Sequence, residues 1–271
     1  MPFQLVKVSD QGTENPIVAR LSVQTSELIK FCSRGEDFNN SVFSLFHEKV
    51  QKHLLECDQI AREIHQEVLD IDAEIGDEGI KTQADGRVIE VPHVMRLVPR
   101  VEQFLYCAKS ALRDLAEIFE LFWGKKFEGA RYDKIIAWAK EEYGDDSELV
   151  RLLEQDHDQW IKKLVAMRNA VEHPGGYSGY LHIHNIALVS PDHPRYPTLE
   201  PPRWNLNDDP EKSLVDDLLT FTSNILEFSE DLLIICIKMS GLPDMLGFSE
   251  IPKEKRDPTC PIRIRVVPKS L

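Results

Sequence analysis

The sequence predicts a mainly α protein, an up-and-down helical bundle of four to five helices with small β or irregular appendages. Three observations support this prediction. Apolar residues recur at three- and four-residue steps over long stretches of the chain. Glycine or proline stands where most of these stretches begin or end. Only a few short runs show the alternation of apolar and polar residues that is typical of strands.

Five stretches carry the helical pattern. Gly76 and Gly241 mark the ends of the first and the last, and Asp209-Pro210 is a strong start signal before the last. The expected helices span Phe38 to about Ile75, Pro92 or Pro99 to Trp123, Tyr132 to Tyr143, Ser147 to Glu172, and Leu214 to Met239.

The remaining segments set the expected domain organisation. Residues 1–35 are predicted to be an N-terminal extended segment, with extended pieces at Phe3–Val8 and Ile17–Val23. The helical bundle then spans 36–240. It carries an irregular insertion at 174–210, where the proline spacing excludes a helix and Tyr180–Val189 favours a strand. Residues 241–271 form a Pro-rich basic tail with a short strand at Ile262–Val266.

Charge and cysteine usage limit the function classes. The net charge of −14 argues against a sequence-independent nucleic-acid coat protein, but an enzyme can still engage a few phosphates. Residues 251–271 hold six Lys or Arg against two acidic residues, so this tail is expected either to dock on the acidic body or to meet RNA. The five cysteines form no CxxC pair, and neither a metal site nor a cofactor is predicted. Without a long apolar run or a signal peptide, we expect a cytoplasmic protein with no membrane partner.

The clearest chemical signal lies where the helix from Ser147 is expected to end. Arg168 and Asn169 are adjacent there, and His173 follows five residues after the arginine. Arginine can hold a phosphate through its planar fork of donors, and histidine can move a proton near neutral pH. Two other pairs have a similar spacing but lack the adjacent Asn and the helix end, namely Arg87 with His93 and Arg151 with His157.

This segment resembles the motif of the HEPN superfamily, helical bundles whose ribonuclease members carry an Arg followed, after four to six residues, by a His. The resemblance rests on Arg168, Asn169 and His173, and the bundle pattern over roughly 38–240 is compatible with it. It implies a metal-independent endoribonuclease, without a cofactor, in which the motifs of a homodimer form one composite site on RNA. His173 would be the acid and base, Arg168 the phosphate clamp, and Asn169 would orient them. A role in defence or as a toxin, and an antitoxin-type protein partner, are also implied.

Other interpretations of the same residues stay open. Arg168 and Glu172 are four apart on a helix and fit an ordinary surface ion pair. His173 fits a helix end, where a basic side chain caps the last carbonyls. These features suit a non-catalytic HEPN-like module for dimerisation or interaction, and a nucleotide is a further ligand class for the same polar residues.

Two further histidines lie close together in the sequence, beyond the Arg–His motif. His182 and His184 alternate on the expected strand, so both rings face one side. With Asp192 and His193 they could bind a divalent metal, but two imidazoles on the solvent-exposed face of an edge strand are the favoured interpretation.

Overall fold

The described chain starts with helical structure where the sequence predicts an extended piece. The computed structural model of the protein describes residues 11–32, 34–78, 90–189 and 198–269, so the expected piece Phe3–Val8 lies outside the described residues. The Asn15 side chain accepts a hydrogen bond from the Ile17 N–H and caps the first turn. The chain continues through α1 (Pro16–Val18), the π-helical η1 (Ala19–Gln24), α2 (Thr25–Leu28) and η2 (Ile29–Phe31).

The prediction of extended structure at Ile17–Val23 is therefore wrong. Its β-branched residues favour a strand. In the structure Ile17 to Leu21 are all buried, and a continuously buried run of this kind does not by itself distinguish a strand from a helix. Pro16 in the first turn and the Asn15 cap supply the start signal that the apolar pattern conceals.

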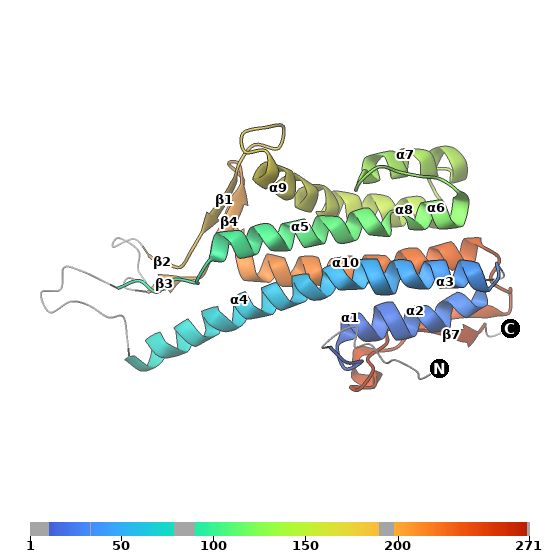
Figure 1. Cartoon of the computed structure of the whole chain (residues 1–271), viewed down its shortest axis with the longest axis horizontal. Coiled ribbons are helices and arrows are strands. Elements are labelled where there is room, and N and C mark those ends of the chain that lie inside the picture. Colours follow the sequence, from blue (N-terminus) through green and yellow to red (C-terminus); the bar gives the residue numbers. More distant parts are fainter. Residues whose placement is uncertain (1–10, 33, 79–89, 190–197, 270–271) are drawn as a thin grey trace, which may run out of the picture. The chain divides into compact units, whose positions relative to one another are not determined.

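Both compact units of the chain are mainly α, which confirms the predicted fold class at that level (Figure 1). Unit 1 comprises Met1–Leu55, Ser110–His157 and Ile225–Leu271, and unit 2 comprises Glu56–Lys109 and Asp158–Asn224. The chain passes between them within four elements, namely α4 (Gln51–Glu78), α5 (Leu97–Leu115), the π-helical η4 (His157–Ile161) and α10 (Leu214–Met239).

Unit 1 is built on helices with recognisable caps. The Ser147 hydroxyl accepts a hydrogen bond from the Val150 N–H at the start of α8, and Gly124 ends α6 in the left-handed conformation with φ of 67°. Trp138 on α7 lies among aromatic rings from α6 and the loop after it, 5.7 Å from the centres of Phe119 and Phe127. The further helices of this unit are α3 (Glu36–Ser44), η3 (Leu45–Val50), α6 (Ile118–Trp123), α7 (Tyr132–Tyr143) and α8 (Glu148–Asp156).

The C-terminal tail is held within unit 1 by a buried ion pair. Its strands β6 (Leu246–Glu250) and β7 (Ile264–Pro268) pair antiparallel, with the short helix η5 (Lys253–Lys255) between them. Arg263, just before β7, donates from Nε to the fully buried Glu230 of α10 at 2.9 Å. Docking on the acidic body, one of the two expectations for this tail, is confirmed for Arg263.

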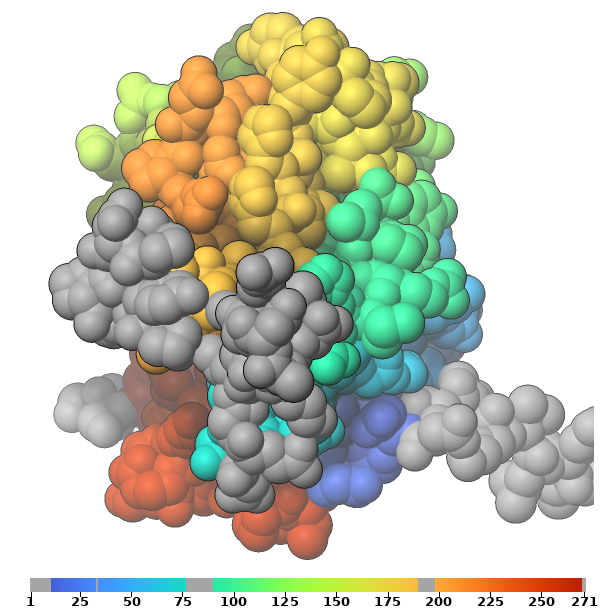
Figure 2. Space-filling model, turned by 90° about the vertical axis from the view of Figure 1, so that its left-hand side faces the viewer, coloured from blue at the N-terminus to red at the C-terminus, as the bar shows by residue number. Residues whose placement is uncertain are grey.

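Unit 2 contains more strand than the predicted irregular insertion allows. A three-stranded antiparallel sheet has the order β1-β4-β5, and a second pair joins β2 to β3. Figure 2 shows the yellow chain of β1 beside the orange chain of β4 and β5. The strands are β1 (Leu181–His184), β2 (Ala187–Leu188), β3 (Leu199–Glu200), β4 (Arg203–Leu206) and β5 (Lys212–Ser213).

The expectation of an irregular 174–210 is thus corrected at β3 and β4. Pro201 and Pro202 precede β4 and do not interrupt it, because proline is compatible with the start of a strand. Trp204 anchors β4, since its indole is fully buried and its Nε1–H donates to the Asp217 carboxylate on α10 at 2.9 Å.

Of the helices that the structure describes, none combines the length and the apolar character needed to cross a membrane.

Candidate functional site

The helix that carries the Arg–His motif ends as the sequence predicts. In α9 (Lys162–Glu172) the buried side is made by Leu164, Met167 and Ala170. His173 follows the last helical residue with φ of −134° and ψ of 74°, and its N–H donates to the Asn169 carbonyl at 2.9 Å. The motif therefore spans the final turn of α9 and its C-terminal cap.

The Gly-rich segment after the motif is a turn with defined hydrogen bonds. The Gly175 N–H donates to the Gly179 carbonyl at 2.9 Å, and Gly179 has φ of 76°, a left-handed conformation that glycine adopts without strain. The Asn207 side chain accepts from the Tyr180 N–H at 2.9 Å and donates to the Ser178 carbonyl at 3.2 Å. In Figure 1 this turn connects α9 to β1. The residue next to β4 thus holds the turn that follows His173.

Arg168 is placed against an aromatic ring and a carboxylate. Its side chain is only 16% exposed, and a guanidinium nitrogen lies 3.5 Å from Oε2 of Glu172. The guanidinium carbon stands 5.7 Å from the centre of the Tyr106 ring on α5, within the range of a cation–π contact. The Tyr106 side chain is itself 47% exposed, so this ring is open to solvent beside the arginine.

Lys109 of α5 joins the motif residues. Its Nζ donates to Oδ1 of Asn169 at 2.7 Å and lies 3.8 Å from Oε2 of Glu172. One carboxylate oxygen thus lies within 4 Å of two cations, Lys109 and Arg168. We call Lys109, Arg168, Asn169 and Glu172 the α5–α9 charge cluster.

The His173 ring is exposed and makes no hydrogen bond or ion pair with any residue in the described parts of the chain. Over those same residues, no hydrogen bond joins it to Arg168. Arg168 and Asn169 are therefore brought together with Lys109, whereas His173 presents its ring to solvent at the next position after Glu172. Both ring nitrogens remain available to a ligand.

Lys109 and Tyr106 are the residues that sequence reasoning missed. They lie about 60 positions before the motif, on a helix whose apolar pattern predicts its buried face but not this contact. The available signal is weak, since Lys109 is the one charged residue between Glu102 and Arg113, inside the most regular part of that pattern.

The metal candidates do not assemble in the described residues. His182 and His184 are both exposed on β1, and Nε2 of His184 lies 3.6 Å from a Glu211 carboxylate oxygen. Asp192 and His193 lie outside the described residues. Across the ranges that the structure describes, no three His, Cys, Asp or Glu side chains gather as a metal site requires. Of the other Arg and His pairs with a spacing similar to that of the motif, the pair Arg87 and His93 has its arginine outside the described residues.

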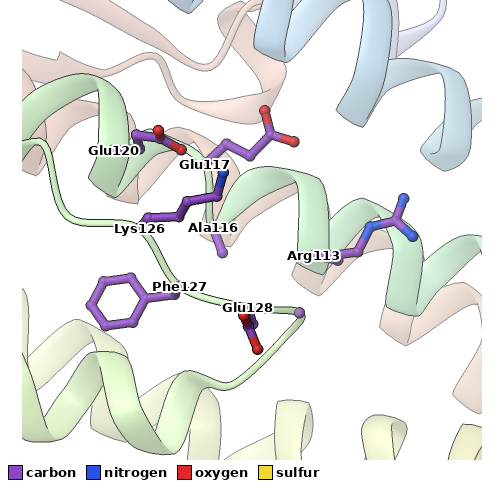
Figure 3. A pocket seen from close by; sticks show the side chains of 8 residues that line it. Arg113, Ala116, Glu117, Glu120, Lys126, Phe127 and Glu128 are labelled. Carbon is purple, nitrogen blue, oxygen red and sulfur yellow. The ribbon is translucent and has the colours of Figure 1, made fainter.

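An open pocket lies elsewhere, in unit 1. Its volume is about 420 Å³, and Figure 3 shows the loop of Lys126, Phe127 and Glu128 passing the end of α5. Two of its charges already have partners, because Glu117 pairs with Lys49 at 2.6 Å and Arg113 pairs with Asp114. It contains none of the motif residues. Its lining is Arg113, Ala116, Glu117, Glu120, Lys126, Phe127, Glu128 and Gly129.

Comparison of this chain with models of protein families, with curated proteins and with solved structures finds no match. The functional argument therefore depends on the residues themselves.

Proposed function

We propose that this protein is a metal-independent endoribonuclease of the HEPN type, a homodimer that cleaves RNA at the C-terminal end of α9. One observation carries the proposal. An exposed His173, whose ring makes no hydrogen bond to the described residues, directly follows a cluster in which Lys109 and Arg168 flank one carboxylate oxygen. Proton transfer and phosphate binding are the two tasks that RNA cleavage requires of a protein.

The chemistry needs no metal because RNA supplies its own nucleophile. The 2′-hydroxyl oxygen attacks the adjacent phosphorus, and the bond from phosphorus to the 5′ oxygen of the next nucleotide breaks. His173 of one chain takes the 2′ proton, and the partner's His173 gives a proton to the leaving oxygen. The products are a 2′,3′-cyclic phosphate and a 5′-hydroxyl. Arg168 and Lys109 stabilise the negative charge of the phosphorane-like transition state, while Asn169 positions Lys109.

The dimer is part of the proposal because each chain offers one histidine at this site, and a separate base and acid require two. An up-and-down arrangement of the helices, a cytoplasmic location, a role as a toxin or in defence, and an antitoxin-type protein partner complete it. They follow from the HEPN resemblance of Arg168, Asn169 and His173.

The alternative function is a non-catalytic HEPN-like module for dimerisation or interaction. The contact at 3.5 Å between Arg168 and Glu172 favours it, because this is the ordinary ion pair of residues four apart on a helix. In that case the cluster stabilises the end of α9 and binds no phosphate.

The test uses the full chain purified in EDTA and a single-stranded RNA with a fluorophore at its 5′ end. We expect cleavage to cyclic-phosphate ends by the wild type and loss of cleavage in His173→Ala, with an unchanged melting curve because the ring is exposed. His182→Ala, an exposed histidine on β1, is the matched control and should cleave like the wild type. Undiminished cleavage by His173→Ala, or no cleavage by the wild type, overturns the enzyme proposal.

A further inference from the structure

The α5–α9 charge cluster holds its own negative charge. Oε2 of Glu172 lies 3.5 Å from the Arg168 guanidinium and 3.8 Å from Nζ of Lys109. A phosphate oxygen that bridges the same two cations competes with this carboxylate oxygen for their donors. In the structure a side chain of the protein therefore stands where the proposed substrate would bind.

We propose that Glu172 is an autoinhibitory occupant of the phosphate site, which single-stranded RNA displaces when it binds. This inference rests on the proposed function, since it concerns how the same site takes its substrate. It adds a regulatory role for Glu172, the residue between the clamp and the histidine.

The contacts of Glu172 suit a group that leaves. Close charge-assisted hydrogen bonds measure about 2.7–2.9 Å, and both contacts of Oε2 are longer than that. The side chain is 45% exposed and belongs to the last residue of α9. A negative charge there opposes the helix dipole, so the two cations hold the carboxylate in place against the preference of the helix.

The cations, by contrast, have other anchors that remain when Glu172 moves away. Lys109 donates to Asn169 at 2.7 Å, and the Arg168 guanidinium stands against the Tyr106 ring. Both side chains are more buried than Glu172, at 30% and 16% exposed. After displacement the site therefore keeps two positioned positive charges for a phosphate.

Tyr106 indicates which nucleic acid fits. Its ring is about half exposed and lies one helical turn from Lys109, beside the arginine. Unpaired bases stack on such rings, whereas bases inside a duplex are not available for stacking. A single strand can place a base on Tyr106 while its phosphate contacts Lys109 and Arg168.

The test measures binding and not cleavage, so that it stands apart from the test of the enzyme. A fluorescent single-stranded RNA with 2′-O-methyl groups throughout cannot be cleaved by its own 2′ oxygen. Its binding to the full chain is followed by fluorescence anisotropy. We expect Glu172→Gln to bind it about three- to five-fold more tightly than the wild type, the size of effect typical of one exposed ion pair.

The matched control is Glu141→Gln, which removes the same charge from an exposed position on α7, outside the cluster and outside both helices that form it. It should bind like the wild type, and Lys109→Ala combined with Glu172→Gln should lose the gain. An equal gain in the control, or no gain in Glu172→Gln, overturns the inference. An equal gain for a duplex of the same sequence overturns the assignment to single strands. Cleavage that persists in His173→Ala, or no cleavage by the wild type, would overturn only the enzyme proposal and would leave this binding result intact.

Discussion

Removal of the buried Glu230 carboxylate should destabilise unit 1 strongly. This side chain is 1% exposed, and its two oxygens accept hydrogen bonds from three residues. Arg20 donates from Nε at 2.8 Å and also from a terminal nitrogen, Gln24 donates at 2.7 Å, and Arg263 donates from Nε at 2.9 Å. One carboxylate thus lies between two buried guanidinium groups, and the one that belongs to the C-terminal tail, Arg263, also donates to Asp231.

The substitution Glu230→Gln keeps the volume but removes the charge. Arg20 and Arg263, 6% and 11% exposed, would then face each other without a shared counter-charge, and the new amide hydrogens would point at donors. Breaking a buried pair in this way costs about 3–5 kcal/mol. We therefore expect about 3 kcal/mol of the free energy of unfolding to be lost. This is a large share of the about 5–15 kcal/mol by which whole domains are stable.

Urea unfolding followed by circular dichroism measures this loss, with an expected shift of about 1 M in the midpoint if the slope is about 3 kcal/mol/M. The matched control is Asp133→Asn, which breaks an exposed pair with Arg131 in the same unit at 3.1 Å. The control should leave the midpoint nearly unchanged. A loss for Glu230→Gln no larger than that of the control would refute the reasoning, because the buried carboxylate would then not be holding the two arginines.

Three further outcomes are expected. Trp204→Phe removes the indole N–H that binds a carboxylate of α10 and part of a fully buried ring, so unfolding should become easier by about 2–3 kcal/mol; an unchanged urea midpoint would contradict this. Gly179→Ala places a methyl group at φ of 76° and against the Asn207 amide, so a loss of about 1–3 kcal/mol is expected by the same assay. Burial raises the pKa of Asp114, but hydrogen bonds from His53 and Arg113 outweigh it and hold that pKa below its usual value. Since the folded-state pKa is lowered, Asp114 contributes stability above the unfolded value of about 3.9 and loses it as the pH falls through the folded value. Asp114→Asn should therefore destabilise the protein more at pH 7 than at pH 3, and an equal loss at both pH values would speak against the assigned cause.

The long helices could be predicted from the sequence because the apolar residues that define them are close together along the chain. Phe38 to about Ile75 was expected as one helix, and the structure has continuous helical geometry from α3 through α4, with a π-helical stretch at η3. The end of α9 at Glu172 was expected from Pro174 and the glycines after it. Local signals of this kind require no knowledge of distant residues.

The strands and the N-terminal segment were harder to predict, for different reasons. The sequence of β4 gives little sign of a strand, and it forms because Leu206 and Arg203 pair with Leu181 and His184 of β1. Such pairing joins residues 19 to 25 positions apart, so no local pattern reveals it. At Ile17–Val23 the local pattern is ambiguous, because Ile17 to Leu21 are all buried and a continuously buried run suits a strand and a helix alike.

By itself, the sequence determined where the helices run and that Arg168, Asn169 and His173 lie at the end of one of them. Only the tertiary structure decided what these residues meet. Lys109 and Tyr106 come from α5, and they contact Asn169 and Arg168 because two helices pack side by side within unit 2. Helical periodicity fixes which face of a helix a residue occupies, but the neighbour across that face depends on packing between segments far apart in the chain.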